Sequence, residues 1–259
     1  DIHTSRKNFK KLRGVIRAVR PALGELVYKR ENAFFRDVGR ELSGYRESFV
    51  QVKTLDFMVK EFPNQLDTSG VTELRERLKA DHADRMEKLR AGDRTHSIAA
   101  RLARTTEEIA DWPLQRNHAL VLDGITATYR RGRKEYRQAR NEPTTERLHS
   151  WRKRVKYHWY QVRMIKAAWP ELLAPLDDAV HSLADDLGDD HDYADFEARV
   201  IDGGEIKLSP KMIRKLHKAM AARRDALQTS AFGAARRIYA EEPAHFARRL
   251  GAYLEFTWA

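Results

Sequence analysis

Residues 2–10 read IHTSRKNFK, and residues 148–156 read LHSWRKRVK. The two stretches align at a constant offset of 146 residues, from His3 to His149, so that histidine meets histidine, arginine meets arginine and lysine meets lysine. A repeated core requires only a repeated apolar pattern. Here the repeated positions are cationic, which indicates two halves of one fold that face the same polyanion.

Helical geometry places the repeated charges on one side of each stretch. Residues spaced by 3, 7, 10 and 14 share a side because each residue turns the helix by about 100°. We call this side the basic stripe; it holds His3, Arg6, Lys10, Arg13 and Arg17 in the first copy, and His149, Arg152, Lys156, Trp159 and Arg163 in the second. The apolar side holds Phe9, Leu12, Ile16 and Val19, and then Trp151, Val155, Val162 and Ile165. The pattern predicts two amphipathic helices, each with a core side and a cationic side.

A charged helix side is most often only solvated surface. Residues 2–20, however, contain seven lysine or arginine residues and no acidic residue. Like charges along one helix repel each other, and the unmixed stripe occurs twice. We therefore interpret the stripes as anion-binding. Arginine would offer forked donors to phosphate oxygens, lysine a point charge, and protonated histidine a further donor.

The composition limits the classes of function. A chain of 259 residues holds one large domain or two of ordinary size. Its net charge of +11 favours an anionic partner: nucleic acid, an anionic membrane surface or a phosphate polymer. The lack of cysteine excludes disulfides, thiolate metal sites and cysteine nucleophiles. No apolar run approaches the roughly 20 residues of a membrane-spanning helix, and we expect no membrane partner. The lack of cysteine is compatible with the cytosol, and we expect a cytoplasmic location.

The sequence reads as helix nearly throughout, which predicts an all-α fold. Prolines, glycines and capping residues delimit the expected helices. These are residues 2–19, 23–62, 71–110 with an interruption at Gly92, 111–140, 146–168 capped by Thr144 or Thr145, 175–200, 210–239 capped by Ser209, and a short last helix after Pro243. Gly39 and Gly44 mark a kink or a close contact within the second helix.

The repeat extends beyond the two basic stretches. Residues 42–47, LSGYRE, resemble residues 187–192, LGDDHD, at an offset of 145 from Leu42 to Leu187. We expect a single domain over residues 1–259, with a first helical half at 1–111 and a second at 112–259. A basic helix over residues 114–140 precedes the second stretch and nothing equivalent precedes His3. The first half is therefore expected to lack one upstream helix, unless residues 246–258 take its place.

Two further charged segments stand out. The first is basic: Arg130, Arg131, Arg133, Lys134, Arg137 and Arg140. A solvated helix end and an anion-binding surface explain this cluster equally, since cations suit a helix C-terminus. The second, residues 177–197, carries nine acidic residues and no lysine or arginine. Its residues Asp185, Asp186, Asp189, Asp190, His191 and Asp192 do not follow a calcium-loop spacing. We favour ion pairs with the basic helices, or a solvated surface, over a phosphate-bridging metal there, and expect no metal and no cofactor.

The paired stretches resemble the two signatures of the CHAD domain family, the conserved-histidine α-helical domain. The matching residues are His3-x-x-Arg6-Lys7-x-x-Lys10 and His149-x-x-Arg152-Lys153-x-x-Lys156, and residues 187–192 resemble the family's motif in the following helix. The resemblance implies two antiparallel helical bundles related by a pseudo-two-fold axis, with basic helices lining a central channel. It also implies binding of inorganic polyphosphate and association with polyphosphate granules. The sequence departs from the family pattern at Tyr157, His158 and Trp159, and it lacks the Glu-x-Glu-x-Lys motif of the triphosphate-tunnel domain often joined to this family.

We therefore expect a non-enzymatic protein, with no catalytic residue, whose partner is inorganic polyphosphate and whose channel also accepts sulfate or phosphate ions. The expected contacts are His3, Arg6, Lys7, Lys10, Arg13, Arg17, Arg130, Arg131, His149, Arg152, Lys153, Lys156 and Arg163.

Three alternatives remain open. The first is a nucleic-acid-binding protein with Tyr157, Trp159 and Tyr160 as base-stacking residues. It is less favoured because the first copy has Lys11, Arg13 and Gly14 at those positions. The second is a phosphohydrolase or phosphotransferase, although the sequence contains no glycine-rich phosphate loop and no two-metal carboxylate spacing. The third is a scaffold on storage granules that docks other proteins through its acidic helix.

Overall fold

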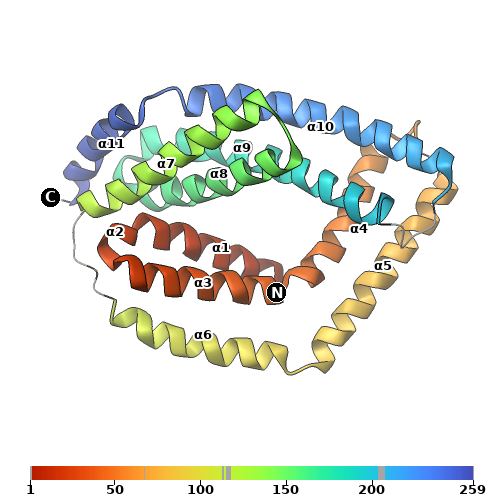
Figure 1. Ribbon diagram of the computed structural model, residues 1–259, viewed down its shortest axis with the longest axis horizontal. Helices are drawn as coiled ribbons and strands as arrows, with labels where there is room; N and C mark the ends of the chain where they lie inside the picture. Colours follow the sequence, from red (N-terminus) through yellow and green to blue (C-terminus); the bar gives the residue numbers. More distant parts are fainter. Residues whose placement is uncertain (1, 67, 113, 115–117, 204–207, 259) are drawn as a thin grey trace. The chain divides into compact units, whose positions relative to one another are not determined.

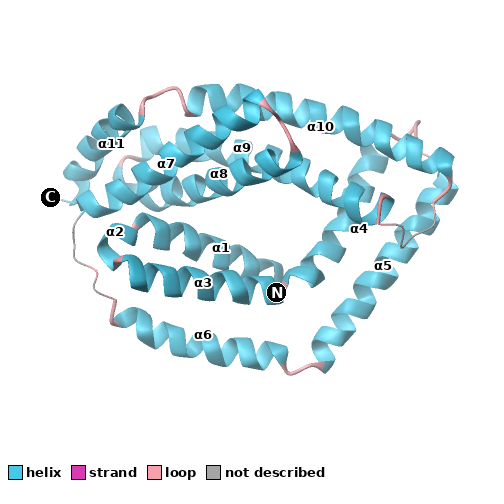
Figure 2. Cartoon of the chain, in the orientation of Figure 1, coloured by secondary structure: helices cyan, strands magenta, loops and turns pink. Residues whose placement is uncertain are grey.

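The computed structural model describes residues 2–66, 68–112, 114, 118–203 and 208–258. These residues form helices joined by short connections, and no strand occurs among them (Figures 1 and 2). The all-α prediction is confirmed. Within this described part, no helix combines the length and the apolar composition that crossing a bilayer requires.

The helices follow one another as α1 (Ile2–Ala18), α2 (Arg20–Leu23), α3 (Glu25–Glu41), α4 (Ser43–Glu61), α5 (Thr68–Ala91), α6 (Arg94–Ala110), α7 (His118–Asn141), α8 (Thr145–Ile165), α9 (Pro170–Phe196), α10 (Pro210–Ile238) and α11 (Pro243–Trp258). A 3₁₀ turn at Lys166–Ala168 follows α8, and a π-helical turn at Glu197–Ile201 follows α9. Two predicted caps are confirmed. The Thr144 hydroxyl accepts a hydrogen bond from the Arg147 amide, and the Ser209 hydroxyl accepts one from the Met212 amide.

Several predicted boundaries are wrong. The helix expected from residue 71 begins at Thr68, and the helix expected from residue 111 begins at His118. The single helix expected over residues 23–62 is two helices, α3 and α4, that separate at Leu42 between the two flagged glycines. Leu42 has φ −99° and ψ 8°, outside the helical range, and its side chain is buried. Helix α9 begins at Pro170 rather than at Pro175, which lies inside the helix. Pro175 is the sixth residue of this helix, beyond the unpaired first amides, so it removes one helical hydrogen bond without ending the helix.

The described chain divides into two compact units. The first unit comprises residues 1–3, 40–110 and 189–227, and the second comprises residues 4–39, 111–188 and 228–259. Each unit takes residues from both expected sequence halves. The division at residues 111 and 112 remains a prediction drawn from the repeat.

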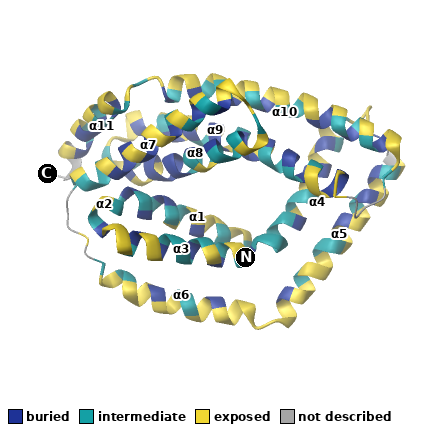
Figure 3. Ribbon diagram, viewed as in Figure 1, coloured by how far each residue is buried: buried dark blue, intermediate teal, exposed yellow. Residues whose placement is uncertain are grey.

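The first unit buries one side of each of its long helices. Leu55 and Met58 of α4 and Leu74 of α5 share a core cluster with Phe196 of α9 and Leu216 of α10. Helix α6 buries Ile98 and Thr105 and leaves most of its other residues exposed (Figure 3). The core of this unit therefore lies among α4, α5, α9 and α10.

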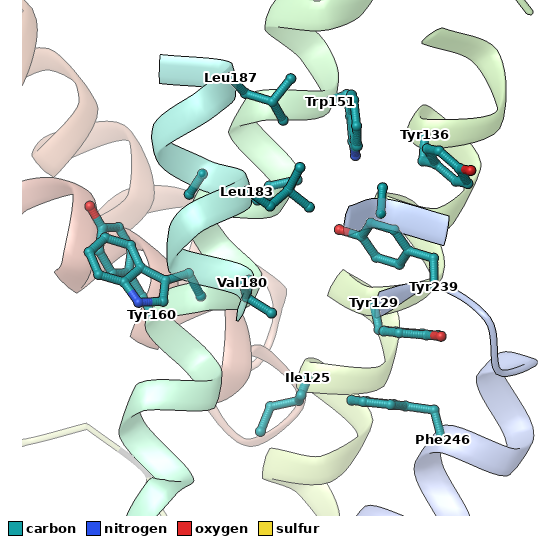
Figure 4. Packing of buried hydrophobic residues seen from close by; sticks show 14 of the residues in the cluster. Ile125, Tyr129, Tyr136, Trp151, Tyr160, Val180, Leu183, Leu187, Tyr239 and Phe246 are labelled. Carbon is teal, nitrogen blue, oxygen red and sulfur yellow. The ribbon is translucent and has the colours of Figure 1, made fainter. Parts of the chain in front are cut away.

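The second unit has an aromatic core built on α7 and α8. The Tyr129 ring stacks on Phe246 of α11, with ring centroids 4.0 Å apart and planes within 2° (Figure 4). Trp151 of α8 is fully buried and lies near Tyr136 of α7, with ring centroids 5.5 Å apart. Helices α8 and α9 add aliphatic residues such as Val180 and Leu183. This core holds in place the helices that carry most of the predicted anion contacts.

Candidate functional site

Helix α1 separates apolar and basic residues largely as predicted. Phe9 and Ile16 are buried, and the Phe9 ring packs 6.3 Å from the Phe35 ring of α3. Leu12 is the exception, because 38% of it is exposed. Burial of the apolar side fixes which way the arginines and lysines of α1 point.

Two arginines of the α1 stripe are held by α3. The Arg13 Nε donates to the Asn32 side-chain oxygen at 3.1 Å, and the Arg6 guanidinium donates to the Gly39 carbonyl oxygen. Lys7 and Lys10 remain exposed. The acceptors that α3 offers to Arg6 and Arg13 are neutral, so their positive charges are positioned without being neutralised by these bonds.

Helices α1 and α8 cross at Gly14. The Gln161 amide nitrogen of α8 donates to the Gly14 carbonyl oxygen at 3.0 Å. A Cβ atom added at Gly14 would lie 3.0 Å from the Tyr160 Cβ, tighter than ordinary packing. Glycine therefore allows the two repeated helices to approach closely, which brings the C-terminal half of α1 against α8.

The α8 stripe is partly exposed and partly paired. His149, Arg152 and Lys156 are half-buried, whereas Lys153 and Arg163 are exposed. The Lys156 ammonium lies 3.6 Å from a carboxylate oxygen of Asp185 on α9. One predicted ion pair between the acidic segment and a basic helix is therefore confirmed.

The acidic segment forms further pairs within each unit. In the first unit, the Arg224 Nε donates to the buried carboxylate of Asp190 at 3.0 Å. In the second unit, Lys166 contacts the buried carboxylate of Asp177 at 3.1 Å. Across the described residues, no group of three or more histidine, aspartate or glutamate side chains gathers as a metal site would.

The aromatic residues of α8 are core residues. Tyr157, Trp159 and Tyr160 are all buried, with no more than 8% of any of them exposed. The Trp159 ring stacks on His181 of α9, with centroids 4.0 Å apart and planes within 7°. The prediction that Trp159 lies on the basic side of α8 is therefore wrong, because the helix is apolar on most sides over this stretch. These rings are not available as a platform for nucleic-acid bases.

His158 occupies the centre of this aromatic core. Its ring is fully buried against Tyr129 and Phe246, with centroids 5.6 and 5.7 Å away. Neither ring nitrogen has a hydrogen-bond partner within the described part of the chain. Burial lowers the pKa of His158 to about 4, so the residue is neutral near pH 7. This histidine is structural and contributes no positive charge to a phosphate site.

The basic cluster of α7 divides between two surfaces. Arg130 lines a shallow groove with Lys134 and Arg137, where Glu242 of the α10–α11 connection pairs with Arg133. The next residue, Arg131, lines a different cavity. Adjacent helical residues differ in direction by about 100°. The two arginines, predicted together as polyphosphate contacts, therefore line two different cavities.

The cavity lined by Arg131 has a volume of about 450 Å³ and lies between α1, α2, α3, α7 and α8. We call it the arginine pocket, since Arg17, Arg20, Arg131 and Arg154 all line it. Sequence reasoning included Arg17 and Arg131 as contacts but not Arg20 or Arg154. Arg154 lies off the stripe of α8, and Arg20 follows the end of α1, so stripe periodicity gave no signal for either.

The remaining predicted contact, His3, belongs to the first unit. Its Nδ1 accepts a hydrogen bond from the Arg46 Nε at 2.9 Å, within that unit. His149 belongs to the second unit. The shared role of the two histidines stays a prediction.

Comparison with known proteins agrees with the motifs. A family model described as the CHAD domain matches residues 1–200. No curated protein and no solved structure matches the sequence.

Proposed function

Because this chain belongs to the CHAD domain family, we propose that it binds inorganic polyphosphate through its two basic stripes, without chemical turnover. The observation that carries this proposal is the crossing of α1 and α8. Gly14 and Tyr160, which meet there, occupy the same position in the two repeats, at the offset of 146 residues that relates His3 to His149.

A contact between equivalent positions is typical of two-fold symmetry, in which the same surface patch of each copy meets the other. Such a relation between α1 and α8 supports a pseudo-two-fold arrangement of two helical bundles. The same operation would relate the two stripes. We accordingly propose that they border one basic channel, through which a phosphate chain threads.

The chemistry of the stripes suits a phosphate chain without bases. Lys10 of the α1 stripe offers an exposed ammonium group, and so do Lys7 and Lys153, which directly follow the stripe residues Arg6 and Arg152. These groups act as point charges toward phosphoryl oxygens. Single-stranded nucleic acid binding normally adds aromatic side chains on which bases stack. The α8 aromatics are buried, so the site would recognise charge spacing alone.

Charge removal from the stripes provides the test. The variant combines Lys10→Gln in the α1 stripe with Lys7→Gln and Lys153→Gln, which flank the stripe residues Arg6 and Arg152, and we call it the stripe variant. The control removes three equally exposed charges elsewhere through Lys218→Gln, Arg236→Gln and Arg237→Gln. Affinity for long-chain polyphosphate should fall at least about tenfold in the stripe variant and about twofold in the control, because only the stripe charges contact phosphate. Equal losses in both variants would indicate diffuse charge attraction and contradict the proposal.

Absence of turnover and location are separate parts of the proposal. Prolonged incubation with polyphosphate and magnesium should release no inorganic phosphate, and steady release would show an enzyme.

A fluorescent fusion should colocalise with polyphosphate granules in the cytoplasm and disperse when polyphosphate synthesis is blocked. Unchanged localisation after that block would contradict the granule assignment.

A further inference from the structure

The arginine pocket concentrates positive charge that the lining residues do not balance. Among the described residues that line it, Glu25 is the only carboxylate. Glu25 already accepts from Arg20 at 2.7 Å and lies 3.5 Å from the Lys29 ammonium. The charges of Arg17, Arg131 and Arg154 are therefore left without a carboxylate in the pocket lining.

The pocket is also preorganised. The Arg17 guanidinium lies over the Tyr157 ring, 4.0 Å from its centroid, and the Arg20 guanidinium lies 4.5 Å from the centroid of Tyr28. Stacking on aromatic faces fixes planar guanidinium groups while leaving their edges to donate. The Arg17 side chain also donates to the Arg13 carbonyl oxygen at 2.8 Å. Its orientation is thus set before any ligand binds.

Burial increases the need for an anion. The Arg154 Nε is shielded from solvent and has no hydrogen-bond partner within the described part of the chain. An unpaired buried donor costs about 1–3 kcal/mol. Burial lowers the pKa of Arg17, and the positive charges of Arg13 and Arg154 act in the same direction. An anion in the pocket would relieve this repulsion.

The pocket is distinct from the α8 stripe. Arg154 follows Arg152 by two residues, which places the two side chains about 200° apart around the helix. Tyr157, the other α8 residue of the pocket, follows Arg154 by nearly one turn and lies on the same side. A phosphate chain along Arg152 and Lys156 would therefore run on a different side of α8 from the pocket.

From this geometry, we propose that the arginine pocket is a second anion site, which binds a diphosphate group. One terminal phosphate carries a charge of about −1.5 to −2 near pH 7, and an adjoining phosphate adds about one more, so a diphosphate matches three uncompensated arginines. The forked donors of arginine suit the several oxygens of such a group. A volume of about 450 Å³ falls in the range of small-molecule sites. The diphosphate could be free or part of a nucleotide. Arg17 also belongs to the α1 stripe, whereas Arg131 and Arg154 lie outside both stripes and allow the pocket to be tested separately.

Titration calorimetry and ³¹P NMR with inorganic pyrophosphate test the site on the whole chain. Arg154→Gln should weaken pyrophosphate binding at least about tenfold, as expected for the loss of a charge-assisted contact. Arg131→Gln provides a second variant at an exposed position, should Arg154→Gln fail to fold. The matched control is Arg147→Gln, on the same helix but outside the pocket, which should change the affinity by less than about twofold because exposed ion pairs contribute little.

A parallel titration with ADP identifies the source of the diphosphate. Affinity for ADP equal to that for pyrophosphate would assign the site to nucleotides, and affinity about tenfold weaker would assign it to free diphosphate. Failure of the wild-type protein to bind either compound at millimolar concentration would overturn the proposal. Equal losses of pyrophosphate affinity in Arg154→Gln and Arg147→Gln would also overturn it.

Long-chain polyphosphate separates this inference from the proposed function. Arg154→Gln should keep its affinity for long chains within about threefold, and the stripe variant should keep its affinity for pyrophosphate within the same range. Binding of pyrophosphate without binding of long chains would support the diphosphate site in the arginine pocket and contradict polyphosphate binding by the stripes. Binding of long chains without binding of pyrophosphate would contradict only the diphosphate site.

Discussion

At the scale of single residues, Gly124 has the most restrictive position. It lies on α7 where that helix meets the end of α1, and an added Cβ would clash with the backbone carbonyl of Ala18. A side chain can change rotamer to relieve such a clash, but the Ala18 backbone cannot. Glycine is thus what lets α7 approach α1 closely enough for Arg131 and Arg17 to line one cavity.

We predict that Gly124→Ala destabilises the fold by at least about 2 kcal/mol, as expected for forced overpacking. Gly233→Ala is the control, since Gly233 is an exposed residue within α10 and an added Cβ there meets no atom within 4 Å. That change should stabilise the protein by about 0.5–1 kcal/mol through improved helix propensity. Denaturant unfolding measures both values, and a neutral Gly124→Ala variant would show that α7 does not pack this tightly.

His158 makes stability depend on pH. Its folded-state pKa of about 4 is below the unfolded value of about 6.5, so the unfolded chain binds more protons between these values. The contribution of this residue to stability is therefore lost as pH falls from 6.5 toward 4, with a slope of up to about 1.4 kcal/mol per pH unit.

We predict that His158→Phe, which keeps an aromatic ring beside Tyr129 and Phe246, flattens this slope. The free energy of unfolding at pH 7.5 should change by less than about 1.5 kcal/mol. Unfolding free energies of both proteins measured from pH 7.5 to 4.5 would check it. The same slope in the variant as in the wild type would mean that other groups cause the acid sensitivity.

At the scale of elements, helix starts with a capping side chain were predictable and the α3–α4 break was not. Thr144 and Ser209 mark their helix starts in sequence because their hydroxyls accept from amides that the helix leaves unpaired. Leu42 carries no comparable signal. Leucine favours helix, and the backbone leaves the helical range there while its side chain is buried in the core. Tertiary packing outweighs local propensity at that residue.

The cap at Thr144 gives an element-scale prediction. Thr144→Ala should destabilise the protein by about 1 kcal/mol, because the Arg147 amide loses its acceptor at the start of α8. Thr229→Ala, at an exposed position within α10, should change the free energy of unfolding by less than about 0.5 kcal/mol. Thermal unfolding of the two variants compares them directly, and equal shifts would argue against a capping role.

The candidate site was predictable only in part, because tertiary packing decides which side chains meet there. Helical periodicity identified the stripe positions and the burial of Trp151 and Val155, since both follow from one helix alone. It could not identify the arginine pocket, because Arg20 and Arg154 come together there only through the packing of α2 and α8 in the folded unit. It also misplaced Trp159, whose burial depends on His181 of α9.

At the scale of the whole molecule, a net charge of +11 attracts any polyanion. Overall charge alone therefore cannot distinguish polyphosphate from nucleic acid. Under the proposed function, the two polymers are distinguished by the arrangement of charge without exposed aromatic residues on α8. The salt dependence of binding reports the number of phosphate contacts. Each phosphate contact contributes about 0.7 to the slope of log affinity against log salt concentration. The slope should therefore become shallower by about 2 in the stripe variant, which loses three lysines.

The most direct test of the central claim is a competition titration in which a labelled long-chain polyphosphate is displaced from the protein. The competitors are unlabelled polyphosphate, tRNA and duplex DNA, compared at equal phosphate concentration and physiological salt. We predict half-displacement by polyphosphate at a phosphate concentration at least about tenfold lower than by either nucleic acid. Displacement by tRNA or DNA at an equal or lower concentration would contradict the assignment of the stripes to polyphosphate.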